Sequence, residues 1–108
     1  MGMKIVSVEL RVKQGRAAEF AAGVEKMVRA IERVDGTLAF VVSQSVADPH
    51  DFRFFEIYRD EAAFQEHLRV STTELPGREV LDALVEGPFR PTFGRHVAGG
   101  ARLGVPGA

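Results

Sequence analysis

The chain begins with a regular alternation of apolar and polar side chains. Within residues 4–13, every second position from Val6 to Val12 is apolar, and the positions between them are polar or charged. A period of two is typical of a β-strand with one buried face. The pattern therefore predicts a first strand, which ends at Gly15.

The spacing then changes to that of a helix. Over residues 16–34, apolar side chains recur three and four positions apart, and charged side chains fill the opposite face. Glu25 and Arg29 lie four positions apart on that charged face, where they can form an ion pair. A glycine commonly follows a helix, and Asp35-Gly36 marks the end of this one.

Two further strands are predicted over residues 37–45 and 52–59, because both segments are rich in β-branched and aromatic residues. Turn-forming residues 47–51 join them. Asp60 is a suitable N-cap for a short helix that runs to about Arg69.

A second helical piece is expected after this helix. Ser71, Thr72 and Thr73 are predicted to cap it, since hydroxyl side chains favour helix N-termini. Gly87-Pro88 is expected to end it. Its apolar stripe consists of Val80, Leu81, Leu84 and Val85.

The last strand is predicted over residues 88–97. It contains Pro91, which cannot donate a backbone hydrogen bond, so we expect this strand at a sheet edge or a bulge. Residues 98–108 are rich in glycine and lack periodicity, which indicates a flexible tail. The chain is thus expected to form one domain, residues 1–97, followed by that tail.

The predicted order βαββαβ is that of an α+β, ferredoxin-like fold. Right-handed crossovers place both helical layers on one face of a four-stranded antiparallel sheet. The third strand is nevertheless apolar on both sides: Phe54 and Tyr58 point one way, whereas Phe55 and Ile57 point the other. Large apolar patches are uncommon on monomers, so we expect the uncovered face to meet a second copy in a homodimer.

Composition narrows the classes of function. The 108 residues include 14 basic and 15 acidic side chains, so no excess of positive charge points to nucleic acid. No apolar run is long enough to span a membrane, and the N-terminus leads into a strand rather than a signal peptide. The absence of cysteine excludes disulfides, thiolate metal sites and thiol nucleophiles. These features favour a cytoplasmic globular domain that binds neither nucleic acid nor membranes.

His67 is the first candidate for chemistry. It follows Phe64 by three residues and directly precedes Leu68, so it lies on the apolar, sheet-facing side of its helix. One interpretation is a core histidine whose nitrogens bond to neighbouring backbone. The other is a general base or orienting donor in a cavity between helix and sheet, because the ordinary pKa of histidine suits proton transfer near neutrality.

Glu56 is the second candidate, since it lies two residues before Tyr58 on an aromatic-rich face of the third strand. A carboxylate in such surroundings needs a partner or a raised pKa. It could pair with Arg11, Arg53 or an arginine of the partner subunit. Alternatively, it could act as a pocket acid beside His67 and Tyr58.

The remaining histidines and the phenylalanines carry less information. His50 lies in the turn-rich connector and His96 near the end of the last strand, and the three histidines have no metal-binding spacing. Most phenylalanines are expected in the core, although a few could line a pocket for a flat organic ligand.

The run from Phe54 to Leu68 resembles the signature of the antibiotic biosynthesis monooxygenase (ABM) family, in which a glutamate, an aromatic residue, an aspartate and a histidine follow in this order. Residues 12–16 and the following Glu19-Phe20 resemble the family's entry to its first helix. The resemblance extends over about residues 4–97.

The step after the first helix also resembles the family. In residues 35–38, Asp35 replaces the family's proline, and Phe40 lies near the usual tyrosine. The ordered set of segments, rather than any one of them, identifies the resemblance.

The resemblance implies a ferredoxin-like fold that dimerises into an α/β barrel. It also implies a cofactor-independent monooxygenase: the enzyme deprotonates a small hydroxylated aromatic or quinol, and the resulting anion reduces O2 without a metal or flavin. His67 would be the base, and Glu56 and Tyr58 would orient the substrate. The substrate-binding walls would include Phe20, Phe40, Phe54 and Phe64.

This chain departs from the family pattern at two places, and one of them concerns the haem-degrading branch of the family. Haem-degrading members usually carry a tryptophan and a later ligand histidine on these helices. This chain has no tryptophan, and Gly77-Arg78-Glu79 stands where that ligand would lie, so we do not expect haem turnover. A second histidine that many members carry is also missing, and Ser71-Thr72-Thr73-Glu74 occupies its place.

Two alternatives to the oxygenase remain open. The same base could serve an isomerase-type enzyme that moves a proton on a small carbonyl compound. The domain could also be a non-catalytic dimer module that binds a small ligand.

Overall fold

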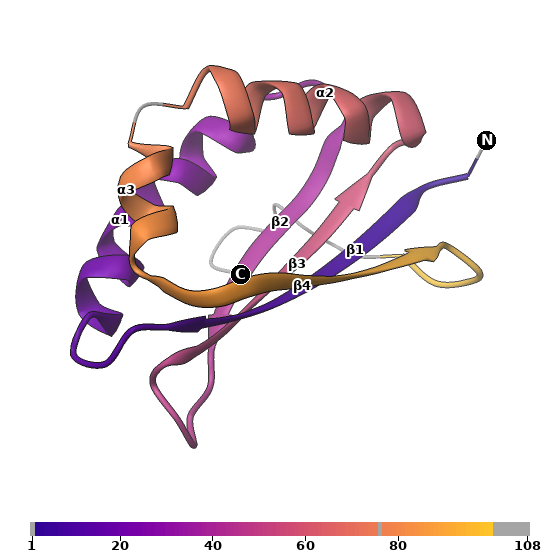
Figure 1. Ribbon diagram of the computed structural model, residues 1–108. Coiled ribbons are helices and arrows are strands. Elements are labelled where there is room, and N and C mark those ends of the chain that lie inside the picture. Colours follow the sequence, from indigo (N-terminus) through magenta and orange to yellow (C-terminus); the bar gives the residue numbers. More distant parts are fainter. Residues whose placement is uncertain (1, 76, 101–108) are drawn as a thin grey trace.

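The computed structural model describes residues 2–75 and 77–100 of the chain (Figure 1). Within this range the helices and strands follow one another in the predicted order. The elements are β1 (Lys4–Val12), α1 (Ala17–Ile31), β2 (Thr37–Gln44), β3 (Asp51–Tyr58), α2 (Glu61–Thr73), α3 (Arg78–Ala83) and β4 (Val85–Arg95).

The strands form a sheet in the order β2-β3-β1-β4, and each neighbouring pair is antiparallel. The helices lie on one side of it, so that the strands form one layer and the helices the other (Figure 1). This is the split βαβ arrangement of a ferredoxin-like fold, as predicted. β4, with Pro91, lies at the sheet edge, where its missing backbone donor is tolerated.

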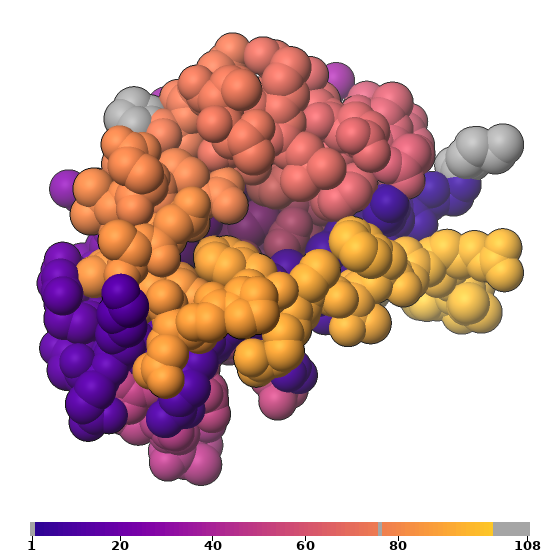
Figure 2. All heavy atoms as spheres, viewed as in Figure 1, coloured from indigo at the N-terminus to yellow at the C-terminus, as the bar shows by residue number. Residues whose placement is uncertain are grey.

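The helical layer does not cover β4 closely. In the space-filling view, α2 and α3 form the upper mass and β4 crosses below them, with a hollow between α2 and β4 (Figure 2). The hollow follows from the topology, because β4 is the edge strand on the side of the sheet away from β2.

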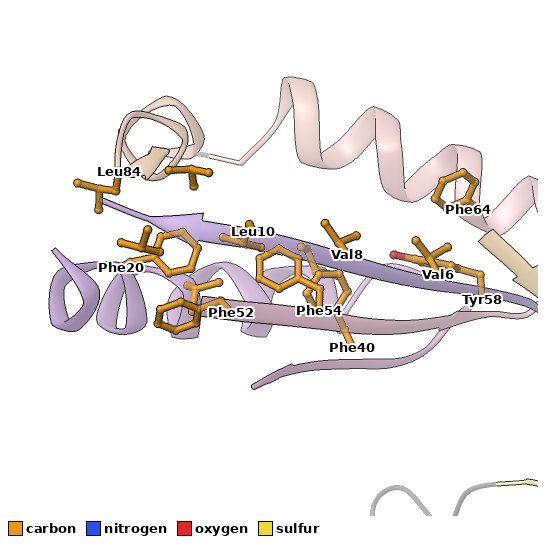
Figure 3. Close-up of a cluster of buried hydrophobic side chains, with 14 of the residues drawn as sticks. Val6, Val8, Leu10, Phe20, Phe40, Phe52, Phe54, Tyr58, Phe64 and Leu84 are labelled. Carbon is orange, nitrogen blue, oxygen red and sulfur yellow. The ribbon is translucent and has the colours of Figure 1, made fainter. Parts of the chain in front are cut away.

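The core lies between the sheet and the helices (Figure 3). Val6, Val8 and Leu10 project from β1 towards the helical layer, and each is at most 8% exposed. The period of two that predicted β1 thus reflects burial of one face. On β3 the same face carries Phe52, Phe54, Glu56 and Tyr58.

α1 ends three residues earlier than the predicted limit of 34, at Ile31, and a turn leads to Gly36. Gly36 has a φ of 87°, in the left-handed region that glycine adopts without strain. A Cβ atom there would lie 2.4 Å from the Cβ of Ala63 in α2. Gly36 therefore both turns the chain and lets α2 approach closely.

The prediction that Ser71, Thr72 and Thr73 cap a second helix is wrong. All three lie inside α2, which continues to Thr73. The hydroxyls of Thr72 and Thr73 donate to the carbonyl oxygens of Leu68 and Arg69, four residues earlier. Such back-bonding accommodates Ser and Thr within a helix, which a capping preference alone does not reveal. The predicted N-cap of α2 is confirmed, because Asp60 accepts a hydrogen bond from the Ala63 backbone.

The predicted end of the second helical piece at Gly87-Pro88 is also wrong. α3 ends at Ala83, and Val85 already pairs with Val12 of β1. Gly87 and Pro88 lie within β4, where the register against β1 shifts near Leu10. The irregularity absorbs a proline that a regular ladder would exclude.

The outer face of the sheet carries an apolar area that the helices do not cover. Val41 and Phe55 face each other across β2 and β3, and they are 47% and 46% exposed. In the next row, Ile5, Ile57 and Ala39 lie side by side. The structure thus agrees with the prediction that the third strand is apolar on both faces.

The chain beyond the sheet is described only in part. Of the tail predicted over residues 98–108, residues 98–100 carry no helix or strand, and residues 101–108 lie outside the described residues. Among the helices described, none combines the length and apolar character needed to cross a membrane.

Candidate functional site

A cavity of about 290 Å³ lies between the helical layer and the sheet, beneath the hollow seen in Figure 2. Every strand and every helix of the described chain contributes to its walls. The lining is mostly apolar, with polar groups from Glu56, His67, Ser71, Arg78 and Asp82. Such a cavity, apolar with a few converging polar groups, is typical of a small-molecule site.

Glu56 lies on the helix-covered face of β3, opposite Val6 on one side and Phe40 on the other. It is only 4% exposed. The Tyr58 hydroxyl, two residues along the same face, donates a hydrogen bond of 2.5 Å to Glu56 Oε1. The period of two in β3 thus brings acid and phenol together.

His67 faces Glu56 from α2. Its Nε2 lies 3.7 Å from Glu56 Oε1, and the residue is 7% exposed. The ring is surrounded by Tyr58, Phe40 and Phe64, whose centroids lie 5.0, 5.7 and 6.4 Å away. Its Nδ1 is buried and has no hydrogen-bond partner among the described residues. His67 lines the cavity, so this unpartnered nitrogen is a candidate for a hydrogen bond with a bound ligand.

Burial shifts both groups towards their neutral forms. It raises the pKa of Glu56 to about 7, against the opposing effect of the Tyr58 hydrogen bond. It lowers the pKa of His67 to about 4, and the positive charge of Arg78 acts in the same direction. The pKa of Tyr58 is raised by burial and by the Glu56 charge. At neutral pH the imidazole is uncharged, and Glu56 is near its titration midpoint.

The arginine partners considered for Glu56 are occupied elsewhere. Arg11 bonds to Asp48 and Asp51, and Arg53 lies 3.6 Å from Glu9 on the outer face. Among the described contacts, Glu56 instead has Tyr58 and His67. The interpretation of an ion pair with Arg11 or Arg53 is therefore wrong, because these side chains leave β1 and β3 away from Glu56.

The predicted wall residues meet at this cavity: Phe20, Phe40, Phe54 and Phe64 all line it. Tyr58 is fully buried and does not, so it reaches the cavity only through Glu56. Other lining residues were not singled out from the sequence. They include Met27 and Leu81 from the helices and Phe89 and Phe93 from β4.

Arg78 is one of three polar lining residues, with Ser71 and Asp82, that the sequence did not point to as site residues. Its Nε donates to Asp82 at 3.0 Å, and its Nη1 donates to the Ser71 carbonyl at 3.0 Å. A single arginine on a short helix usually lies on the surface, so its type gave no signal. A usable signal was Gly23 within α1, where a Cβ would lie 2.5 Å from Leu81 Cδ2, because such a glycine indicates close packing of another element.

The other two histidines lie away from the cavity. His50 accepts a hydrogen bond from the Gly15 backbone and contacts Asp48. These contacts link the turn at Gly15 to the turn between β2 and β3. His96 contacts the Gly99 carbonyl after β4. Across residues 2–75 and 77–100, His, Asp and Glu side chains form no group of three that could hold a metal ion.

Comparison with known sequences gives one family. A profile described as antibiotic biosynthesis monooxygenase matches residues 3–72, which include β1 to α2 and all of Glu56, Tyr58 and His67. No curated protein matches the chain significantly.

Solved structures share the whole fold. A protein of unknown function from Nitrosomonas europaea, NE2512, has a TM-score of 0.79 at 22% identity, covering 96% of this chain and 98% of its own. A candidate antibiotic biosynthesis monooxygenase from Bordetella bronchiseptica has a TM-score of 0.74 at 19% identity, covering 91% of this chain and 100% of its own. Another from Deinococcus radiodurans has a TM-score of 0.70 at 25% identity, covering 91% and 94%.

Proposed function

Because the chain belongs to the antibiotic biosynthesis monooxygenase family, we propose that it oxidises a small hydroxylated aromatic or quinol with O2, without a metal or flavin. The observation that carries this proposal is the Glu56–His67 pair in the wall of an otherwise apolar cavity. The chemistry needs a proton acceptor beside a largely apolar space that holds a flat ring. The Glu56–His67 pair supplies the acceptor, and the phenylalanine walls supply the space.

The aromatic ring would lie among Phe40, Phe54 and Phe64, with its hydroxyl towards His67. Burial disfavours charge on His67, so its imidazole is neutral and can accept a proton. With Glu56 ionised, His67 accepts the hydroxyl proton, and the carboxylate 3.7 Å away stabilises the imidazolium that forms. Tyr58 positions the Glu56 carboxylate through its hydrogen bond.

The substrate supplies the electrons in this reaction. Its anion transfers one electron to O2, and the substrate radical and superoxide combine at a ring carbon as a peroxide. The pair returns its proton to the peroxide, which loses the ring hydrogen and a hydroxyl group as water. A carbonyl remains at that carbon, so one oxygen atom enters the product and the other leaves as water.

Oxygen uptake with a panel of hydroquinones and naphthols tests this proposal. We expect uptake without added metal or flavin, and a loss of about a hundredfold or more in His67→Ala, since a positioned general base contributes about 10²–10⁴-fold. His96→Ala is the matched control, because His96 contacts Gly99 outside the cavity. Equal uptake by wild type and His67→Ala would contradict the role of His67, and product formation without oxygen uptake would favour the isomerase.

We also propose that two copies pair through the outer sheet face, which would give the α/β barrel. Phe55, Val41 and Ile57 supply the apolar rows. The adjacent row is charged: Glu9 lies 3.6 Å from Arg53 and 3.7 Å from Arg90. Light scattering should give about twice the 11.8 kDa of one chain, and Phe55→Glu should shift the mass towards one chain. A wild-type mass of one chain at micromolar concentration would contradict the pairing.

A further inference from the structure

The proposed reaction creates a negative charge inside an apolar cavity. An anion in such a place needs a cation or several hydrogen-bond donors. Two of the lining residues, Glu56 and Asp82, are themselves acidic and would repel it. Arg78 is the one Lys or Arg side chain among the lining residues of the described chain.

The Arg78 guanidinium is held in place rather than free to move. Asp82 Oδ1 fixes its Nε and the Ser71 carbonyl fixes its Nη1, both at 3.0 Å. A guanidinium has five N–H donors in one plane, and the described contacts engage only these two nitrogens. The side chain lines the cavity and is 29% exposed, so it borders both the cavity and solvent.

The charge of Arg78 also reaches the catalytic end of the cavity. It is the second cause, after burial, of the lowered pKa of His67. A ligand that fills the space between α2 and the sheet therefore lies close to His67 and within reach of the positive charge of Arg78. Asp82 is 47% exposed at this end, which leaves the polar end of the cavity partly hydrated.

We infer that Arg78 binds a carboxylate on the substrate, so that the cavity selects hydroxylated aromatic acids over neutral phenols. This inference rests on the proposed function for the position of the ring and its hydroxyl. The planar fork of arginine matches a carboxylate better than a single phenolate oxygen. The carboxylate lies at the Arg78 end, away from Glu56, and the hydroxyl lies beside His67.

Calorimetry under anaerobic conditions tests the inference by binding alone, with 6-hydroxy-2-naphthoate, whose hydroxyl and carboxylate lie at opposite ends of the ring system, and 2-naphthol as probes. We expect wild type to bind the acid at least about tenfold more tightly, as one hydrogen bond to a charged group is worth about a factor of ten or more. Arg78→Gln should remove this preference, because it should weaken binding of the acid far more than binding of naphthol. Arg78→Lys keeps the positive charge but lacks the planar pair of donors, so it should retain part of the preference for the acid.

Arg69→Gln is the matched control, because Arg69 is an exposed arginine of α2 that pairs with Glu66 and Glu74 and does not line the cavity. It should keep the full preference for the acid. A preference that survives in Arg78→Gln, equal affinities for both probes in wild type, or a lack of binding by the acid would each overturn the inference. A merely structural role of Arg78 would lower the melting temperature and weaken both probes alike.

The two proposals fail separately. If the acid binds through Arg78 but no probe or hydroquinone supports oxygen uptake, the carboxylate site stands and the oxygenase does not. If oxygen uptake depends on His67 but Arg78→Gln leaves KM for acidic and neutral substrates unchanged, the oxygenase stands and the carboxylate site does not.

Discussion

The two ends of the helix-covered sheet face use similar residues for different purposes. At one end Phe52, Leu10 and Val12 are each at most 2% exposed, and none of them lines the cavity. At the other end Phe54 faces the cavity, together with Glu56. The packed end gains stability from close contact, whereas the cavity end gives up contacts and buries two ionisable groups. The difference indicates that stability and chemistry are separated along β3.

Truncation of one phenylalanine at each end gives the largest expected effect. Phe52→Ala should destabilise the fold by about 3–5 kcal/mol, because it removes a buried ring from a closely packed site. Phe54→Ala should cost less, since its ring already borders empty space. Chemical denaturation measures the free energy of unfolding of both variants. Equal destabilisation by the two substitutions would contradict the difference between a packed end and a cavity end.

Removal of the buried acid should have an intermediate effect that depends on pH. The Glu56 pKa is raised from 4.5 to about 7 in the folded state, so the folded protein binds more protons than the unfolded chain between these values. Wild type therefore loses stability from this group as pH rises through that window. Glu56→Gln avoids this loss, and its stability relative to wild type should improve by about 3 kcal/mol between pH 4 and pH 8, since a shift of one pKa unit corresponds to about 1.4 kcal/mol.

Denaturation at both pH values measures this difference, and oxygen uptake should fall in the same variant. Asp51→Asn is a control, because Asp51 is a partly exposed acid at the start of the same strand. A stability difference between Glu56→Gln and wild type that does not change with pH would show that the buried carboxyl does not titrate in this range.

The smallest expected effect on stability comes from Gly23→Ala. The added methyl would approach Leu81 Cδ2, the end of a flexible side chain, and alanine favours a helix by about 1 kcal/mol over glycine. These effects oppose each other, so the melting temperature should change little. Because Leu81 lines the cavity on the same short helix as Arg78, affinity for the naphthoate probe should change several-fold. An unchanged affinity would show that ligand binding in the cavity does not depend on how closely α3 packs against α1.

Much of this arrangement could be predicted from the sequence, and the remainder has physical reasons. The alternation in β1 and the aromatic pattern of β3 identified the sheet, because burial of one face imposes a period of two. The common face of Glu56 and Tyr58, and the sheet-facing side of His67, followed from the same reasoning. The limits of α2 and α3 did not, since Ser and Thr serve both as caps and within helices. The position of Arg78 depends on how α3 packs against α1, and no local sequence pattern predicts that packing.

β4 has a consequence for how this domain can change. Its two prolines weaken its pairing, and among the described strands it has a neighbour, β1, on one side only. Phe89, Pro91 and Phe93 nevertheless form one wall of the cavity. The shape of the cavity can therefore be altered by substitutions in β4 that leave the acid and the histidine in place. A lineage could acquire new substrates through this strand while it keeps its chemistry on β3 and α2.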